Sequence, residues 1–228
     1  MNEQHFLAII LLSLILGANA FNYKDAKNWG EKYPKCNGKN QSPIDMKSYP
    51  IIPREFPKGL KKLKLTDFDK LPTKVSIKNT GHTVELRADY SGKPPKISSG
   101  NLHGIYVFEK ITFHWAKKRV GPVMDGVTFD DLANNLKKVE SINSTTDIPP
   151  FVITGAVDPV PAYLFYKGSL DYPPCSESVT WFLYDSEVFI TADLLNGLRK
   201  VKLSEGDVSN FRPAQPINNR QIKTMMTE

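Results

Sequence analysis

The stretch from Ile105 to Trp115 constrains the fold of this chain more than any other segment, because most of it is β-branched or aromatic. Such residues favour extended backbone, so the segment predicts one long central β-strand. Side chains alternate between the two faces of a strand. One face therefore carries the more polar set Tyr106, Phe108, Lys110, Thr112 and His114. The other face is apolar and carries Val107, Ile111, Phe113 and Trp115.

The composition around this strand predicts a mainly β fold with short helices. A hydrophobic content of 40% is enough for a core, and 17 prolines with 14 glycines indicate many turns. Two alternating runs, 75–77 and 83–86, flank the polar sequence from Asn79 to His82 and predict a β-hairpin. At 228 residues the chain suits one domain of ordinary size or two small ones.

Two segments have the spacing of short helices. From Thr128 to Val139, apolar residues recur every three or four positions, and Thr128 is a suitable N-cap. The segment from Ala192 to Val201 is the second.

Residues 1–20 are predicted to be a cleaved signal peptide, which leaves residues 21–228 as a single domain. The run from Phe6 to Gly17 is apolar but short for a membrane span, and it ends in the small-x-small sequence Ala18-Asn19-Ala20. A signal anchor is the alternative, since no Lys or Arg precedes the run. No second apolar run follows, so we expect a secreted protein without a transmembrane segment.

Two features fit an oxidising extracellular compartment. The chain has two cysteines, Cys36 and Cys175, and an even count there indicates a disulfide, with two buried free thiols as the alternative. A disulfide between them would close nearly the whole domain into one loop. A loop of that size contributes about 4–5 kcal/mol to the free energy of unfolding. The polar sequence Asn143-Ser144-Thr145 is an N-glycosylation sequon and predicts a glycan on Asn143.

The chain is basic, with a formal net charge of +6, and lysine supplies most of the positive charge. Glu3 is the only charged side chain in residues 1–20, so their removal makes the remainder more basic. This balance favours an anionic partner, such as a sulfated glycan or an acidic protein surface, with solubility alone as the alternative. No nucleic-acid-binding motif is present in the sequence.

Three motifs resemble the secreted α-type carbonic anhydrases. Residues 36–45, which contain Cys36 and the sequence Gln-Ser-Pro-Ile, resemble the start of that family. Residues 168–175 resemble its Gly-Ser-Leu-Thr-Thr-Pro-Pro sequence, and residues 210–220 resemble its closing segment. The resemblance implies a central, twisted, mostly antiparallel sheet and a disulfide between Cys36 and Cys175.

The resemblance also implies a zinc site on the predicted strand from Ile105 to Trp115. Family members carry Gln-x-His-x-His-Trp there, and the two His are two of three zinc ligands. This chain has Lys110, Thr112, His114 and Trp115 at the corresponding positions, so one ligand position is kept and Thr112 replaces the other. A neutral hydroxyl is a poor substitute for imidazole, and no histidine follows His114 to act as the third ligand. We therefore expect no zinc and no other cofactor, although active family members hold zinc.

Further positions of the family site are occupied by other residues or are left without a role. His82 falls on the position of the proton-shuttle histidine, but without a zinc-bound water it is predicted to be vestigial. Asp171 replaces the threonine that gates the site, and Tyr172 replaces the one that lines the substrate pocket. Lys110 and Asp171 both approach the former metal position, which predicts an ion pair between them.

The middle of the chain is shorter than the family requires. Only 54 residues separate Trp115 from Leu170, so the sheet is expected to lack one or two central strands. Either the protein has adapted to a shortened sheet, or the sequence reflects a skipped exon or an imperfect gene model. Thr112 and Asp171 lie outside the shortened part, which indicates that catalytic selection was relaxed independently of it.

These observations predict a secreted, carbonic-anhydrase-like protein that is catalytically inactive because two of three zinc histidines are absent. Its role would be binding or structural, with an anionic glycan or an extracellular protein as partner. The alternative is a zinc lyase for reversible CO2 hydration, if the full transcript restores the missing segment.

Overall fold

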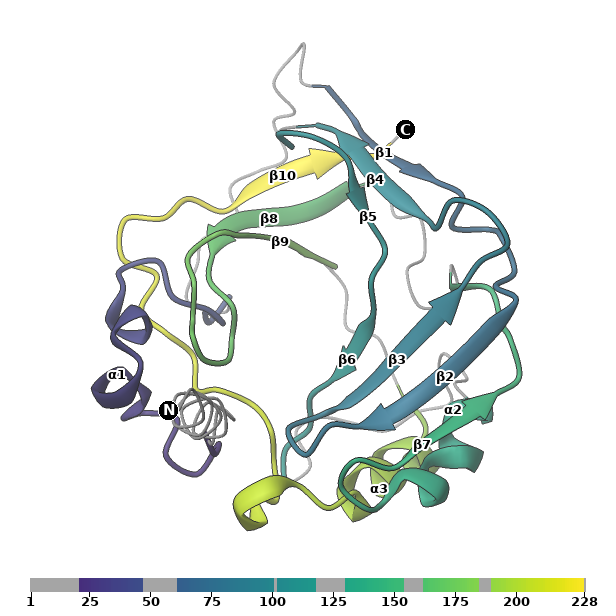
Figure 1. Cartoon of the computed structure of the whole chain (residues 1–228). Helices are drawn as coiled ribbons and strands as arrows, with labels where there is room; N and C mark the ends of the chain where they lie inside the picture. The colour runs from purple at the N-terminus through teal and green to yellow at the C-terminus, as the bar shows by residue number, and fades with distance from the viewer. Residues whose placement is uncertain are drawn as a thin grey trace, which may run out of the picture.

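The computed structural model describes residues 21–46, 61–100, 102–117, 130–153, 162–184 and 190–227. Within these ranges the chain is mainly β, with antiparallel strands in three sheets and a few short helices (Figure 1). This confirms the predicted fold class. The predicted signal peptide and the predicted helix start at Thr128 lie outside the described residues. Among the described helices, none is long and apolar enough to cross a bilayer.

The largest sheet has the strand order β6-β3-β2-β7. Its strands are β2 (Lys74–Asn79), β3 (Val84–Asp89), β6 (Ile111–Phe113) and β7 (Thr145–Ile148). β2 and β3 form the predicted hairpin. Gly81 in its turn has a φ of +85°, which residues with a Cβ rarely adopt. Alternate residues of β2 are buried, as in a sheet with one face on the core.

Short helices cover this sheet near β2 and β7 (Figure 1). They are α2 (Asp130–Asn135), the 3-10 helix η2 (Leu136–Val139) and α3 (Ala192–Lys200). Both predicted helical segments are therefore present, although the first ends as a 3-10 helix. α3 begins after Thr191, whose hydroxyl accepts a hydrogen bond from the backbone N–H of Leu194 and caps the helix.

The helices and the sheet share the largest hydrophobic core of the described residues. Leu132, Leu136 and Val139 are almost fully buried, so the predicted helical face does point inward. They pack in one cluster with Ile77 and Leu86 of the hairpin. Trp115, directly after β6, belongs to the same cluster and fixes the end of that strand against it.

Two three-stranded sheets, with the orders β1-β4-β5 and β10-β8-β9, lie on the other side of the molecule (Figure 1). Their strands are β1 (Leu63–Thr66), β4 (Lys96–Ser99), β5 (Tyr106–Val107), β8 (Ala162–Gly168), β9 (Val179–Leu183) and β10 (Lys223–Met226). A parallel bridge between Leu63 and Thr227 joins these sheets. Tyr163, Phe165 and Met225 pack with Leu63 in a second core.

The structure corrects the prediction of one unbroken strand from Ile105 to Trp115. β5 pairs with β4, whereas β6 pairs with β3, so the two halves belong to different sheets. Residues 108–110 between them are not strand. A high β-propensity favours extended backbone but does not specify which partner each part of the segment finds.

The predicted alternation of faces holds only in the second half of this segment. Ile111 and Phe113 pack against the main core, while Thr112 and His114 line a cavity. In the first half, Tyr106 and Val107 are 48% and 60% exposed, so the apolar face predicted for Val107 is not buried. The reason is that β5 has only β4 as a strand neighbour among the described residues.

The order of strands is interrupted between β6 and β9. Within the described ranges, β6 pairs only with β3 and β9 pairs only with β8, so each has one edge without a strand partner there. Figure 1 shows the two strands facing each other across the interior without pairing. Residues 118–129, 154–161 and 185–189 lie outside the described residues, so the expected lack of central strands stays a prediction.

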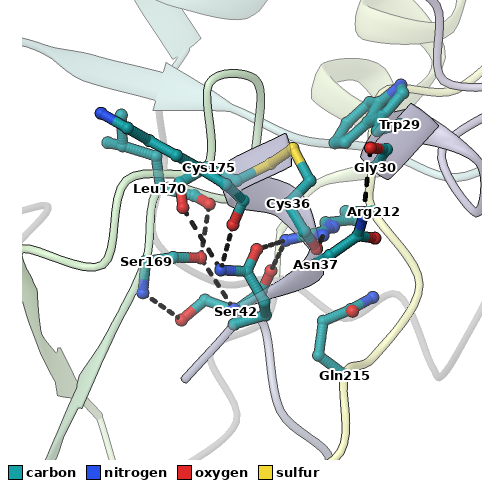
Figure 2. The surroundings of a disulfide bond; sticks show 12 residues. Trp29, Gly30, Cys36, Asn37, Ser42, Ser169, Leu170, Cys175, Arg212 and Gln215 are labelled. Atoms are coloured by element: carbon teal, nitrogen blue, oxygen red, sulfur yellow. Dashed lines mark hydrogen bonds between the residues drawn. A yellow bond between two sulfur atoms is a disulfide. The ribbon is translucent and has the colours of Figure 1, made fainter. Parts of the chain in front are cut away.

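The predicted disulfide between Cys36 and Cys175 is present (Figure 2). It joins the 3-10 helix η1 (Pro34–Asn37) to the loop that follows β8. Arg212 lies beside it and donates hydrogen bonds to the carbonyl oxygens of Cys36 and Ser42, at 3.2 and 3.0 Å. These bonds satisfy backbone groups that burial would otherwise leave without a partner.

Side chains of the Gln-Ser-Pro-Ile and closing motifs extend this network. Gln41 receives a hydrogen bond from Arg212 and donates one to the carbonyl oxygen of Lys35. The guanidinium of Arg212 also lies 5.5 Å from the centroid of Trp29, in the helix α1 (Trp29–Lys32). Asn218 donates to the carbonyl oxygen of Lys39 at 2.6 Å. These hydrogen bonds hold the C-terminal segment against the N-terminal part of the chain.

Replacing both cysteines with serine should destabilise the protein strongly. The disulfide spans 139 positions of sequence, and a loop of that size contributes about 5 kcal/mol by restricting the unfolded chain. Denaturant unfolding of the Cys36→Ser/Cys175→Ser variant measures the loss. Reduced wild-type protein should match the variant, and the variant should not respond to reductant. A variant within about 1 kcal/mol of the oxidised wild type would contradict this account.

Candidate functional site beside His114

A cavity of about 520 Å³ lies where β6 and the β2–β3 hairpin meet the N-terminal segment and the loop after β8. It contains the predicted polar residues Lys110, Thr112 and His114, and it also contains His82. The other lining residues are Phe21, Tyr23, Thr80, Thr83, Glu85, Tyr172, Pro173, Ser204 and Glu205. The lining comes from segments far apart in sequence, so only the tertiary fold brings it together.

His114 is held in place by the buried residue Asn210. The Nδ1 atom of His114 lies 2.7 Å from the carbonyl oxygen of Asn210. A carbonyl oxygen can only accept, so Nδ1 is the donor and Nε2 is left for other contacts. The side-chain oxygen of Asn210 accepts from the backbone N–H of Trp115 at 2.7 Å, and its amide nitrogen donates to the carbonyl oxygen of Phe113 at 2.8 Å.

Asp171 lies against the free ring nitrogen of His114. Its Oδ2 atom is 3.6 Å from Nε2, which is too long for a hydrogen bond but close enough for an electrostatic contact. The side chains of His114 and Asp171 are 29% and 17% exposed, so solvent screens this contact only partly. The carboxylate of Asp171 therefore faces the ring of His114.

The predicted ion pair between Lys110 and Asp171 is wrong, because each side chain has a different partner. The ammonium of Lys110 contacts Oε1 of Glu85 at 2.5 Å. Glu85 lies on β3 directly opposite Thr112, and so reaches the same face of the sheet as Lys110. The sequence does not show which strand lies next to β6, so the local pattern could not identify Glu85.

Burial and charge act in opposite directions on Glu85. Burial raises the pKa of this carboxyl, but the hydrogen bond and positive charge of Lys110, followed by those of Arg87, outweigh burial and hold the pKa below its usual value. Glu85 therefore stays ionised at neutral pH and pairs with the Lys110 ammonium beside the cavity. A cation would meet that ammonium in the same cavity.

The described residues offer few donors for a metal ion. Thr112 lines the cavity, and its hydroxyl has no hydrogen-bond partner within the described ranges. His114 and Asp171 supply one imidazole and one carboxylate, whereas a catalytic zinc site uses three protein ligands. Nowhere in the described part of the chain do three His, Cys, Asp or Glu side chains converge in a geometry suited to a metal.

His82 forms part of the wall of the cavity through an aromatic stack. Its ring lies 4.0 Å from that of Phe21, centroid to centroid, with 10° between the planes. The buried Nδ1 atom has no hydrogen-bond partner in the part of the chain that the structure describes. Burial lowers the pKa of His82, although the charges of Asp207 and Glu205 oppose the change. The neutral imidazole is therefore favoured at neutral pH.

Two tyrosines complete the wall near Asp171. Burial, followed by the negative charge of Asp171, raises the pKa of Tyr23 well above its usual value. Tyr172, which replaces a threonine of the family, also lines the cavity. Asp207 accepts a hydrogen bond from the backbone N–H of Tyr23 at 2.7 Å and so fixes the N-terminal segment over the cavity.

Sequence reasoning missed three residues that shape this site, namely Glu85, Asn210 and Phe21. Asn210 stands in the closing segment that resembles the family, but its contacts with Phe113 and His114 depend on tertiary structure. Phe21 gives no local sign that it stacks on a histidine 61 positions away. Each of these residues acts through a contact between distant parts of the chain.

Replacing His82 with phenylalanine should reduce the loss of stability at acidic pH. The pKa of His82 is lower in the folded than in the unfolded chain, so the folded state binds fewer protons and stability falls as pH drops below about 6.5. Phenylalanine keeps the stack on Phe21 and does not titrate. Denaturant unfolding at about pH 8 and pH 5.5 should show a smaller difference for His82→Phe than for wild type. An equal difference in both proteins would rule out this role for His82.

Comparison with known proteins places the chain among carbonic anhydrases. The family model for eukaryotic-type carbonic anhydrase matches residues 24–126 and 119–226. Carbonic anhydrase 7 of Mus musculus is 28% identical over 248 aligned positions, covering 86% of this chain and 92% of that protein. Carbonic anhydrase 6 of Mus musculus is 22% identical, covering 86% of this chain and 76% of that protein. Receptor-type tyrosine-protein phosphatase zeta of Homo sapiens is 26% identical over 88% of this chain, but over only 11% of its own length.

Two details of these matches bear on the shortened middle. The alignment with carbonic anhydrase 7 is longer than this 228-residue chain, so that relative has residues without a counterpart here. The family model matches in two pieces that meet at residues 119–126, directly after the segment that carries His114. Together the pieces span most of the sequence. The chain therefore belongs to the eukaryotic-type carbonic anhydrase family.

Proposed function

We propose that this protein is a secreted, catalytically inactive member of the family with a binding or structural role. The observation that carries the proposal is the donor set at His114. One imidazole faces a carboxylate there, and a lysine ammonium lies on the same face of the strand. Carbonic anhydrase chemistry needs a metal-bound water whose pKa is brought near 7, and three neutral imidazoles with one open position achieve this.

Each residue of this donor set works against a catalytic zinc ion. Thr112 offers a neutral hydroxyl where an imidazole is needed. Asp171 would add a negative charge next to the zinc ion. The ion would then withdraw less electron density from its bound water, so the pKa of that water would rise. Lys110 repels any cation that enters the cavity. His82 then has no zinc-bound water from which to carry protons, so its position is vestigial.

Several features support an extracellular role for residues 21–228 as one domain after removal of residues 1–20. The Cys36–Cys175 disulfide fits an oxidising compartment. Asn143 is exposed in the turn between η2 and β7, where an attached glycan would meet solvent. The surplus of lysine favours an anionic glycan or an acidic extracellular protein as partner.

The length of the alignments favours a second candidate, which is an active zinc lyase encoded by a fuller transcript. Relatives align over more positions than this chain has residues, and the family model breaks at 119–126. A segment restored between Trp115 and Thr128 could supply a further histidine. Sequencing the transcript across that junction decides between the two candidates. An uninterrupted junction supports the inactive protein, and an additional in-frame segment with histidine supports the lyase.

The purified protein should contain far less than one zinc ion per chain and should not accelerate CO2 hydration. Elemental analysis measures the metal, and stopped-flow pH-indicator assays measure hydration. An active carbonic anhydrase, purified and dialysed in parallel, controls for loss of zinc during handling. One zinc per chain, removed by a chelator together with hydration activity, would overturn the proposal.

A further inference from the structure

A second cavity, of about 460 Å³, opens beside the β10-β8-β9 sheet and shares no lining residue with the first. Its lining residues are His103, Phe165, Tyr166, Lys167, Asn219, Arg220, Gln221 and Lys223. The set combines three cationic side chains, a histidine, two amides and two aromatic rings. None of these lining residues is acidic.

The pairing of strands explains why the lysines meet at this cavity. Lys223 on β10 lies directly opposite Phe165 on β8, so both point to the same face of the sheet. Lys167 follows Phe165 by two positions and therefore points to that face as well. Phe165 is buried on the face of the two exposed lysines, whereas Tyr166 is buried on the opposite face, where it packs in another core cluster.

The charges at this cavity are not neutralised by their immediate neighbours. Lys167 donates its ammonium to the hydroxyl of Thr180 at 2.6 Å, which adds no negative charge. Lys223 forms no ion pair within the described ranges. Glu177 offsets part of the charge of Arg220, but it is not among the residues that line the cavity. The cavity therefore presents a local excess of positive charge.

Arg220 adds a fixed donor to the lysines. Its Nε and Nη2 atoms donate to the carbonyl oxygens of Ile217 and Pro216, at 3.0 and 2.7 Å, and its guanidinium lies 5.6 Å from the ring centroid of Tyr166. These contacts hold the guanidinium rigidly. The remaining nitrogen, Nη1, is buried and has no hydrogen-bond partner within the described ranges. The carbonyl oxygens leave the charge of the guanidinium in place, so Arg220 adds a fixed positive charge to the cavity.

The geometry points to a binding site for the acidic sugar units of an anionic glycan at this cavity. Sulfate or carboxylate groups would bind the lysines and Arg220, as charge-assisted hydrogen bonds favour. The amides of Asn219 and Gln221 would bind sugar hydroxyls, which an acidic peptide lacks. The volume lies in the range of ordinary ligand pockets. This inference rests on the anionic partner of the proposed function and assigns it a site.

The inference is tested with a heparin octasaccharide as the probe and the full chain as the receptor. Surface plasmon resonance at low ionic strength should show binding that weakens as salt is added. The Lys167→Gln/Lys223→Gln variant should bind at least about tenfold more weakly, because each charge-assisted bond contributes roughly a factor of ten or more. Both lysines are exposed, so the unfolding midpoint of the variant should stay that of wild type.

The matched control removes two exposed lysines elsewhere on the chain. Lys137 and Lys138 lie on η2, away from the cavity, and the Lys137→Gln/Lys138→Gln variant has the same net charge as the test variant. Its affinity should stay within about twofold of wild type. An equal loss in both variants, or no binding by wild type, would overturn the inference. Tighter binding of a polyglutamate peptide of equal charge would also overturn it, in favour of an acidic protein.

A hyaluronan octasaccharide identifies the anionic group that is recognised. If hyaluronan binds as tightly as heparin, the site is supported and a carboxylate is sufficient for recognition. If only heparin binds, the site is supported and sulfate is the recognised group. Zinc content measured on the same samples separates this inference from the catalytic one. Stoichiometric zinc would overturn the inactive assignment and leave the glycan result standing, whereas lost glycan binding would leave the inactive assignment standing.

Discussion

The hydrogen bonds of Asn210 are the contacts on which the geometry of the site depends. The side chain of Asn210 is fully buried and binds the backbone of Phe113, Trp115 and His82, while the backbone carbonyl oxygen of Asn210 fixes the ring of His114. One residue thus joins the end of β6, the turn of the β2–β3 hairpin and the C-terminal segment. A buried amide whose partners are removed costs about 1–3 kcal/mol per group, so these segments are held as a unit. The cavity keeps its shape because of this residue, whatever chemistry takes place in it.

Electrostatic contacts organise the polar side chains around Thr112. His114 faces the Asp171 carboxylate on one side of Thr112, and Lys110 forms an ion pair with Glu85 on the other. Such pairs stabilise a partly buried cavity only modestly, because desolvation offsets their attraction. Their effect on function is larger, since a bound cation would have to displace Asp171 from His114 and approach the Lys110 ammonium. The substitutions therefore favour a cavity without a catalytic metal.

Local sequence patterns predicted the parts of the fold that depend on local physics. The hairpin around Asn79 to His82 and the buried helical residues Leu132, Leu136 and Val139 follow from alternation and periodicity. The Cys36–Cys175 bond followed from the family resemblance rather than from spacing. The break at residues 108–110 could not be foreseen, because β-propensity does not reveal that β5 and β6 join different sheets. The partner of Lys110 was missed for the same reason, since Glu85 is placed by strand pairing alone.

The central claim is that too few suitable donors converge on His114 to hold a catalytic metal ion. Anomalous diffraction at the zinc absorption edge, from crystals grown with zinc at a concentration that loads an active carbonic anhydrase, tests this claim most directly. The account predicts no anomalous peak beside Nε2 of His114. A peak about 2.1 Å from that atom, with two further protein donors around it, would contradict the account.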